Sequence, residues 1–344
     1  RMPRSIFLVQ QANPFKHWTC FALSGHSHGN LRMNKIDYPT LLLLGLLMFT
    51  NTAGGSAGDT AQQSNVLAVI GGSHIDRRHI DSFFSDEADV LETITVETSA
   101  GTSPPILRMQ HDGVPFYYVK FHGFSDVAAS DMKGHNLVTM FAAFDQLGVT
   151  HIIAGATAGG LQPEFRKGDL ILSNDLINLN FERPSNILAE ANIQRPGIRA
   201  TFNPPVCPDV HRVLSDLALE GYKAGRVFTG GVVVQDDASR YETPAEIRMY
   251  QTIGGDIITH NVVTEMIYAR QLGMHLAVVN AVSNPAVGVR PFTRDEEMDV
   301  ADRIAEGTRP IILKALKQLH QLPPHDDEIC RGEGYQKQTV AEDN

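Results

Sequence analysis

Four short segments of this 344-residue sequence place polar or glycine-rich groups directly after apolar runs. In open α/β folds, ligands collect where strands end and helices begin, because backbone N–H groups and the helix dipole favour anions there. These groups could therefore hold a small anionic molecule. The four segments are Gly71-Gly72-Ser73, Lys120 with His122, Ala156-Thr157-Ala158-Gly159-Gly160, and Ser283-Asn284-Pro285.

Each segment also has a simpler interpretation. Gly-Gly pairs commonly form turns, a Lys-x-His pattern is usually surface, and an asparagine before proline is an ordinary turn. Neither glycine segment has the spacing of the Walker or dinucleotide-binding motifs. Composition and spacing alone therefore predict an α/β protein with an anionic small-molecule site.

The segments that must position these groups alternate between strand-like and helix-like patterns. Residues 66–70 form a continuous apolar run that ends at Gly71, which is typical of a strand buried on both faces. Thr243 followed by Pro244 marks a helix start. This alternation predicts an α/β fold with a mostly parallel or mixed sheet. Further strands are expected at 116–119, 151–155, 169–172, 230–234 and 275–282, and helices at 137–147, 244–253, 262–272 and 296–319.

Residues 1–65 differ in character from the rest of the chain. A weakly basic stretch after Met33 leads into a short apolar run and then small residues, as in a secretory signal peptide. The run is far shorter than the ~20 residues of a membrane-spanning helix. We expect a signal peptide over 33–57, cleavage near Gly55 or Ala57, and a secreted or periplasmic protein. An unremoved apolar helix in a cytoplasmic protein is the alternative.

The composition favours one ordinary globular domain. Apolar residues make up 42% and charged residues 20% of the chain, and no internal repeat is visible. We expect a single domain over 66–322, a polar tail over 323–344, and no membrane insertion after processing. The net charge of −10 argues against nucleic acid as a partner, because nucleic-acid-binding proteins usually carry a basic face.

The cysteines predict no metal site. Cys20, Cys207 and Cys330 are too few and too scattered for a disulfide scaffold or a zinc motif. A bridge between Cys207 and Cys330 and two unrelated thiols both remain open, because sequence does not give their distance.

Taken together and in order, the chemistry-bearing segments resemble the trimeric purine nucleoside phosphorylase and methylthioadenosine (methylthioinosine) phosphorylase family. Tyr241-Glu242-Thr243-Pro244-Ala245-Glu246-Ile247-Arg248-Met249 is similar to the family's Phe-Glu-Thr-Pro-Ala-Glu-Ile-Arg-Met and is highly specific. The likeness covers about 250 residues, the size of one large domain. The other matching segments are Val69–Ser73 with the first phosphate loop, Lys120-Phe121-His122 with Arg-Phe-His, Ala156–Leu161 and Gly168-Asp169 with Asn-Ala-Ala-Gly-Gly-Leu and its trailing Gly-Asp, and Thr264–Gly273 with a helix that begins Pro-Glu.

The resemblance implies a single-domain nucleoside phosphorylase-like fold, a twisted mixed sheet flanked by helices. It also implies phosphorolysis of a purine nucleoside to a free base and ribose 1-phosphate by a homotrimer. No metal or organic cofactor is implied, and inorganic phosphate is the co-substrate. Such a reaction needs a phosphate clamp and a hydrogen-bond donor beside the departing base.

The resemblance carries roles onto individual residues. Asn284 and His122 would be catalytic, and Glu242 would accept from a base N1–H while Asn284 bonds N7 and O6. Family members that prefer 6-aminopurines have Asp in place of Asn284, so Glu242 together with Asn284 favours a 6-oxopurine substrate. Alternatively, Glu242 has no role in binding and only interacts favourably with the dipole at the N-terminus of a helix. The phosphate-binding residues would be Ser73, Lys120, His122, Thr157 and Asn261, and the base- and ribose-binding residues Ala158, Gly159, Tyr241, Glu242, His260 and Asn284.

Several substitutions depart from the family pattern. Lys120 replaces an Arg, which turns a bidentate fork into a point charge. His260 replaces a Met, and Asn261 replaces a Ser or Thr. Phe124 and Ser125 replace the Tyr and Glu beside the family's His. These changes leave open a slow phosphorylase, a hydrolase whose water is positioned by Asp126 or His260, and a nucleoside-binding or storage protein. They also leave open a 5′-hydroxyl or 5′-methylthio substrate.

Overall fold

The computed structural model describes residues 65–72, 87–121, 135–194, 200–236, 240–323 and 330. All of them belong to one compact unit, Asp59–Asn344. The expected signal peptide, Ser73, His122, residues 124–126 and most of the expected polar tail lie outside the described residues. Among the described residues, no helix combines the length and the apolar composition needed to cross a bilayer.

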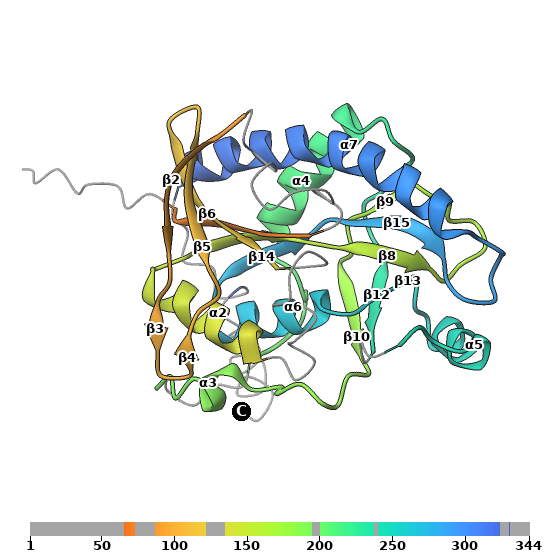
Figure 1. Ribbon diagram of the computed structural model, residues 1–344, viewed down its shortest axis with the longest axis horizontal. Coiled ribbons are helices and arrows are strands. Elements are labelled where there is room, and N and C mark those ends of the chain that lie inside the picture. Colours follow the sequence, from red (N-terminus) through yellow and green to blue (C-terminus); the bar gives the residue numbers. More distant parts are fainter. Residues whose placement is uncertain are drawn as a thin grey trace, which may run out of the picture. The chain divides into compact units, whose positions relative to one another are not determined.

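A six-stranded sheet forms one part of the fold (Figure 1). Its first four strands in spatial order are parallel, and the last two are antiparallel. Its strands at 67–71 and 151–154 are mostly apolar and fully buried, as expected where helices cover both faces. The order is β14 (His275–Val278), β7 (His151–Ala154), β1 (Leu67–Gly71), β6 (Val114–Lys120), β5 (Ile106–His111) and β2 (Asp89–Ile94), and a separate ribbon pairs β3 (Glu97–Thr98) with β4 (Gly101–Thr102).

A seven-stranded sheet forms the other part, and its strands run in mixed directions. The order is β10 (Asp175–Asn178), β12 (Val232–Gln235), β13 (Ile257–Thr259), β8 (Thr157–Gly160), β15 (Asn280–Pro285), β9 (Leu170–Ile171) and β11 (Val227–Phe228).

Two chain segments pass side by side from the first sheet into the second. The β7–β8 and β14–β15 segments remain hydrogen-bonded through the crossing, where Val279 N–H donates to Ala154 O at 2.9 Å. The buried Asn280 side chain secures this crossing: its Oδ1 accepts from Ala156 N at 3.2 Å and its Nδ2 donates to Ser173 Oγ at 3.1 Å. The two sheets are therefore held together by continuous strands.

Helices cover both sides of the sheets. In Figure 1, α4 (Pro208–Gly221) and α7 (Arg294–Gln321) lie on one side, and α2 (His135–Gln146) and α6 (Val262–Gln271) lie on the other. Tyr268 of α6 packs edge-on against Phe141 of α2, with ring centroids 5.7 Å apart. Two shorter helices, α3 (Ile187–Glu190) and α5 (Pro244–Thr252), complete the described part.

The expected α/β class with a mixed sheet flanked by helices is confirmed, with the strands divided between two sheets. The strand expected at 275–282 breaks at Val279, where the chain crosses between the sheets. The glycine-rich 156–160, expected as a strand exit, itself contains strand β8. Gly71 has a packing role, because a Cβ there would lie 2.4 Å from the Tyr118 ring.

A buried carboxylate joins the β8–β9 loop to the β11 region. Asp169 Oδ1 accepts from Arg226 N and Nε, each at 3.1 Å, and Oδ2 accepts from Arg166 N at 2.8 Å and from Arg226 Nη2. The Asp169 side chain is 2% exposed, whereas that of Arg226 is 45% exposed. One carboxylate therefore satisfies two backbone N–H groups and one guanidinium.

We predict that Asp169→Ala lowers the free energy of unfolding by about 3 kcal/mol, because it removes the partner of a charge and of two backbone donors. Glu92→Ala is the control, since Glu92 forms a half-exposed pair with Arg108 at 2.8 Å; we expect a loss below about 1 kcal/mol. Urea unfolding of both variants measures the difference. Equal losses would show that Asp169 contributes no more than a surface ion pair.

Candidate nucleoside site

A pocket of about 520 Å³, counted to its open mouth, lies where β8, β13 and β15 meet the segment before α5. Its lining combines apolar side chains with a few polar groups that could orient a ligand. The lining residues are Thr157, Ala158, Gly159, Tyr241, Glu242, Ile258, Thr259, His260, Ser283, Asn284, Ala286 and Val287.

A β-bulge in β15 sets one wall of this pocket. Val282 pairs with Ala158 and Asn284 pairs with Gly159, so Ser283 is an extra residue without a partner across the strand pair. Bulges redirect side chains and are frequent beside active sites. Gly159 permits the close packing here, since a Cβ would lie 2.9 Å from Ile258 Cγ2. The bulge thus places Asn284 at the pocket, opposite a glycine.

The Asn284 amide is oriented by its neighbours. Ser283 Oγ donates to Asn284 Oδ1 at 2.8 Å, and Asn284 Nδ2 donates to Pro285 O at 3.0 Å. An amide nitrogen carries two hydrogens, so one N–H stays available while the oxygen is occupied by Ser283. Asn284 therefore presents a hydrogen-bond donor to a ligand. Ser283 is buried at 3% exposure; its segment was selected in the sequence, but no role was assigned to Ser283 itself.

Glu242 is available to the pocket because another carboxylate caps α5. Thr243 and Glu246 form a reciprocal capping box, with Thr243 N donating to Glu246 Oε2 at 2.7 Å. Glu246 also pairs with Arg240 at 2.7 Å, which lowers the pKa of Glu246 to about 2. Glu242 precedes the cap residue and is 6% exposed. Glu246, and not Glu242, is therefore the carboxylate in the first turn of α5 that interacts with the helix dipole.

A cluster of ionisable side chains forms the Glu242 side of the pocket. His260 Nδ1 lies 3.3 Å from Asp236 Oδ1, and Tyr250 Oη donates to Asp236 Oδ2 at 3.1 Å. One donor atom from each of Asp236, Glu242 and His260 lies within 4.8 Å of the other two, a set that could also hold a divalent cation. Burial raises the pKa of Glu242, and the negative charge of Asp236 raises it further, while His260 opposes the shift.

A second layer holds this cluster in place. Arg183, which is 8% exposed, donates through Nη1 to the backbone oxygen of His260. Asn180 accepts from Arg183 N at 2.9 Å and donates to Asp236 O at 3.1 Å. The positions of Asp236 and His260 are thereby fixed from the loop after β10.

The sequence analysis did not select two further groups, one in the pocket lining and one beside Glu242 and His260. Asp236 directly follows strand β12, so the strand-end rule that selected the other segments could have found it. Thr259 is the last residue of β13, so the same rule could have found it. Its hydroxyl is buried and has no hydrogen-bond partner among the described residues, which makes it available to a ligand.

The structure brings most of the described candidate residues together. Lys120 ends β6 beside Gly71, and Asn261 is the N-cap residue of α6, directly after His260; neither is among the pocket-lining residues. Ser73 and His122 lie outside the described residues. The candidates that line the pocket are Thr157, Ala158, Gly159, Tyr241, Glu242, His260 and Asn284.

Comparisons with known proteins agree with this site and fold. Residues 87–317 match the model of the phosphorylase superfamily. Because this match spans more than half of the chain, the protein belongs to the phosphorylase superfamily. The resemblance found in the sequence is confirmed.

Relatives with related names align with part of the chain. A probable 6-oxopurine nucleoside phosphorylase of Moorella thermoacetica is 31% identical over 51% of this chain and 66% of its own length. A probable S-methyl-5′-thioinosine phosphorylase of Methanothermobacter thermautotrophicus is 32% identical over 52% of this chain and 60% of its own length. The matched part of this chain thus spans less than two thirds of either relative.

Solved structures show the same fold. Methylthioadenosine phosphorylase of Schistosoma mansoni, in complex with tubercidin, superposes with a TM-score of 0.65 at 17% identity. The superposition covers 81% of this chain and 98% of that one.

We predict that Glu242→Gln raises the melting temperature at neutral pH. The raised pKa means that ionised Glu242 destabilises the folded state once pH exceeds the carboxyl's ordinary value. Glutamine carries no such charge, so its advantage should vanish below about pH 4, where glutamate is protonated in both states. Thermal unfolding across this pH range measures the effect.

Glu246→Gln is the matched control with the opposite sign. Its lowered pKa means that ionised Glu246 stabilises the fold above the ordinary carboxyl value, and this stabilisation is lost as pH falls toward about 2. The control should therefore lower the melting temperature at neutral pH. A decrease for Glu242→Gln at neutral pH would contradict the burial argument.

Proposed function

We propose that this protein cleaves the N-glycosidic bond of a 6-oxopurine nucleoside with inorganic phosphate, giving the free base and ribose 1-phosphate. The observation that carries the proposal is the pairing of a fixed amide donor, Asn284, with a buried carboxylate acceptor, Glu242, in the lining of one pocket. No metal or organic cofactor is needed for this reaction.

The pocket chemistry suits a purine leaving group. Negative charge grows on the base as the glycosidic bond breaks, so the free Asn284 N–H would stabilise the departing base at N7 or O6. Glu242, when ionised, would accept from the N1–H that a 6-oxopurine carries and a 6-aminopurine lacks. Tyr241, 58% exposed at the pocket mouth, would stack on the base or sugar.

The names of the relatives support the same base class. Both 6-oxopurine nucleosides and S-methyl-5′-thioinosine carry a 6-oxopurine, and they differ at the 5′ position of the sugar. We propose that Lys120, the Thr157 backbone and Asn261 at the α6 N-terminus, together with Ser73 and His122, hold the phosphate. A helix N-terminus favours such an anion.

A hydrolase is the second candidate, and one observation favours it. The imidazole of His260 lies 3.3 Å from the Asp236 carboxylate, which itself accepts from Tyr250. An imidazole oriented by a carboxylate can activate a water molecule. Such a water would attack C1′ in place of phosphate and release free ribose.

We predict that inosine, guanosine and their 5′-methylthio forms release base only when phosphate is present, with ribose 1-phosphate or its methylthio analogue formed in equal amount. Adenosine should react more slowly, because it lacks the N1–H that Glu242 accepts. Chromatography of base and sugar products measures both. The same sample should have the mass of a homotrimer by light scattering.

Release of base and free ribose without phosphate would favour the hydrolase. Binding without turnover by the folded trimer would leave a nucleoside-binding protein and would contradict the proposed reaction.

Asn284→Asp should lower the ratio of inosine to adenosine turnover by about 100-fold, because a carboxylate replaces the N–H that donates to a 6-oxopurine. Asn192→Asp is the control, since it adds the same charge at an exposed position away from the pocket. Steady-state kcat/KM for both nucleosides gives the ratio. An unchanged ratio in Asn284→Asp would remove Asn284 from base recognition.

A further inference from the structure

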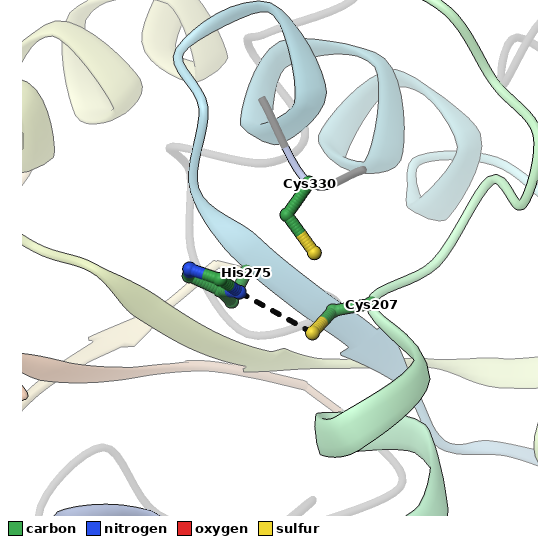
Figure 2. A group of neighbouring side chains, drawn as sticks. All are labelled: Cys207, His275 and Cys330. Atoms are coloured by element: carbon green, nitrogen blue, oxygen red, sulfur yellow. Dashed lines mark hydrogen bonds between the residues drawn. The ribbon is translucent and has the colours of Figure 1, made fainter. Parts of the chain in front are cut away.

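Three side chains that are remote in sequence converge outside the pocket. Cys207 is the N-cap residue of α4, His275 begins β14, and Cys330 follows α7 in the chain. Figure 2 shows both sulfur atoms and the imidazole pointing toward one another. Cys207 Sγ lies 3.3 Å from His275 Nδ1, and one ligand atom from each residue lies within 4.8 Å of the other two.

The backbone around this cluster is fixed by the sheet edge. Cys207 N donates to Leu276 O at 2.8 Å, so the segment before α4 is bonded to the edge strand β14. The His275 ring stacks on His151, with centroids 4.4 Å apart and planes 10° apart. Cys207 and Cys330 are each 1% exposed and His275 is 9% exposed. The donor atoms are thus held close together and away from solvent.

The donor types suit a borderline-soft cation. Thiolate sulfur and neutral imidazole nitrogen are the ligands of protein zinc sites. In a tetrahedral site with ordinary bond lengths, sulfur and nitrogen ligands lie roughly 3.6 Å apart. The observed 3.3 Å requires only a small outward shift.

We propose that Cys207, His275 and Cys330 form a zinc site. Each thiol forms a sulfur–zinc bond and releases its proton to the solvent, and neutral His275 binds through Nδ1. The fourth position is left for water or a small anion. No oxidation or reduction takes part.

The site is separate from the nucleoside pocket. His275 and Asn284 lie at opposite ends of the β14–β15 segment, which crosses between the two sheets. Zinc there joins the chain beyond α7 to the edge strand β14 and to the start of α4. The proposal therefore concerns stability and does not rest on the proposed reaction.

The experiment uses the full chain, reduced and freed of metal with a chelator. Zn²⁺ is titrated against a chromophoric chelator, and Co²⁺ is added separately as a spectroscopic probe. We expect one equivalent to bind per chain and Co²⁺ to give a thiolate-to-metal charge-transfer band. Cys330→Ser should weaken Zn²⁺ binding at least about 100-fold, whereas Cys20→Ser, which alters the remaining cysteine, should leave it unchanged.

A second measurement needs no variant. Zn²⁺ should protect Cys207 and Cys330 from alkylation in the wild-type chain, as mapped by peptide mass spectrometry, and should raise its melting temperature. Unprotected thiols, a cobalt spectrum without the thiolate band, or unchanged affinity in folded Cys330→Ser would overturn the proposal. A Cys207–Cys330 disulfide in the isolated protein, with no zinc bound after its reduction, would overturn it as well.

Discussion

The paired crossing of β7–β8 and β14–β15 is the constraint on which the other parts of this structure depend. Strands that belong to two sheets must leave one without exposing unpaired backbone groups in the interior, because each such group is costly. Asn280 meets this requirement, since its amide bonds both the neighbouring crossing at Ala156 and Ser173. Because β8 and β15 begin at this crossing, the pocket and the β14 cluster take their positions from it.

The pocket shows how an acidic site can be both buried and ordered. Glu242 and Asp236 are close enough to repel each other, and that repulsion is offset by His260 and by the Tyr250 hydroxyl rather than by solvent. The carboxylate of the α5 capping box is Glu246, so Glu242 is not needed to cap this helix. A carboxylate thus remains available for recognition.

Sequence patterns predicted the parts of the fold that depend on local composition. The apolar run at 66–70 becomes β1, and Thr243-Pro244 begins α5 as expected. Strand β2 gave no signal, because it is an exposed edge strand without a buried apolar face. The sequence pattern also did not predict the break at Val279, because the apolar run continues through the point where the chain passes from one sheet to the other.

The resemblance anticipated which segments meet at the pocket but not how their side chains are supported. Asp236 and Arg183 act through contacts between distant segments, and no spacing rule links them. The Cys207–His275 contact likewise exists only because the segment before α4 bonds to the β14 edge. Such partners are determined by topology, which periodicity does not describe.

Because of the bulge at Ser283, part of this site depends on the number of residues in β15 as well as on their types. Loss of Ser283 would restore regular pairing and leave Asn284 opposite Gly159, but it would remove the hydroxyl that donates to Asn284 Oδ1 at 2.8 Å and holds the amide. The fold could tolerate such a deletion better than the site could.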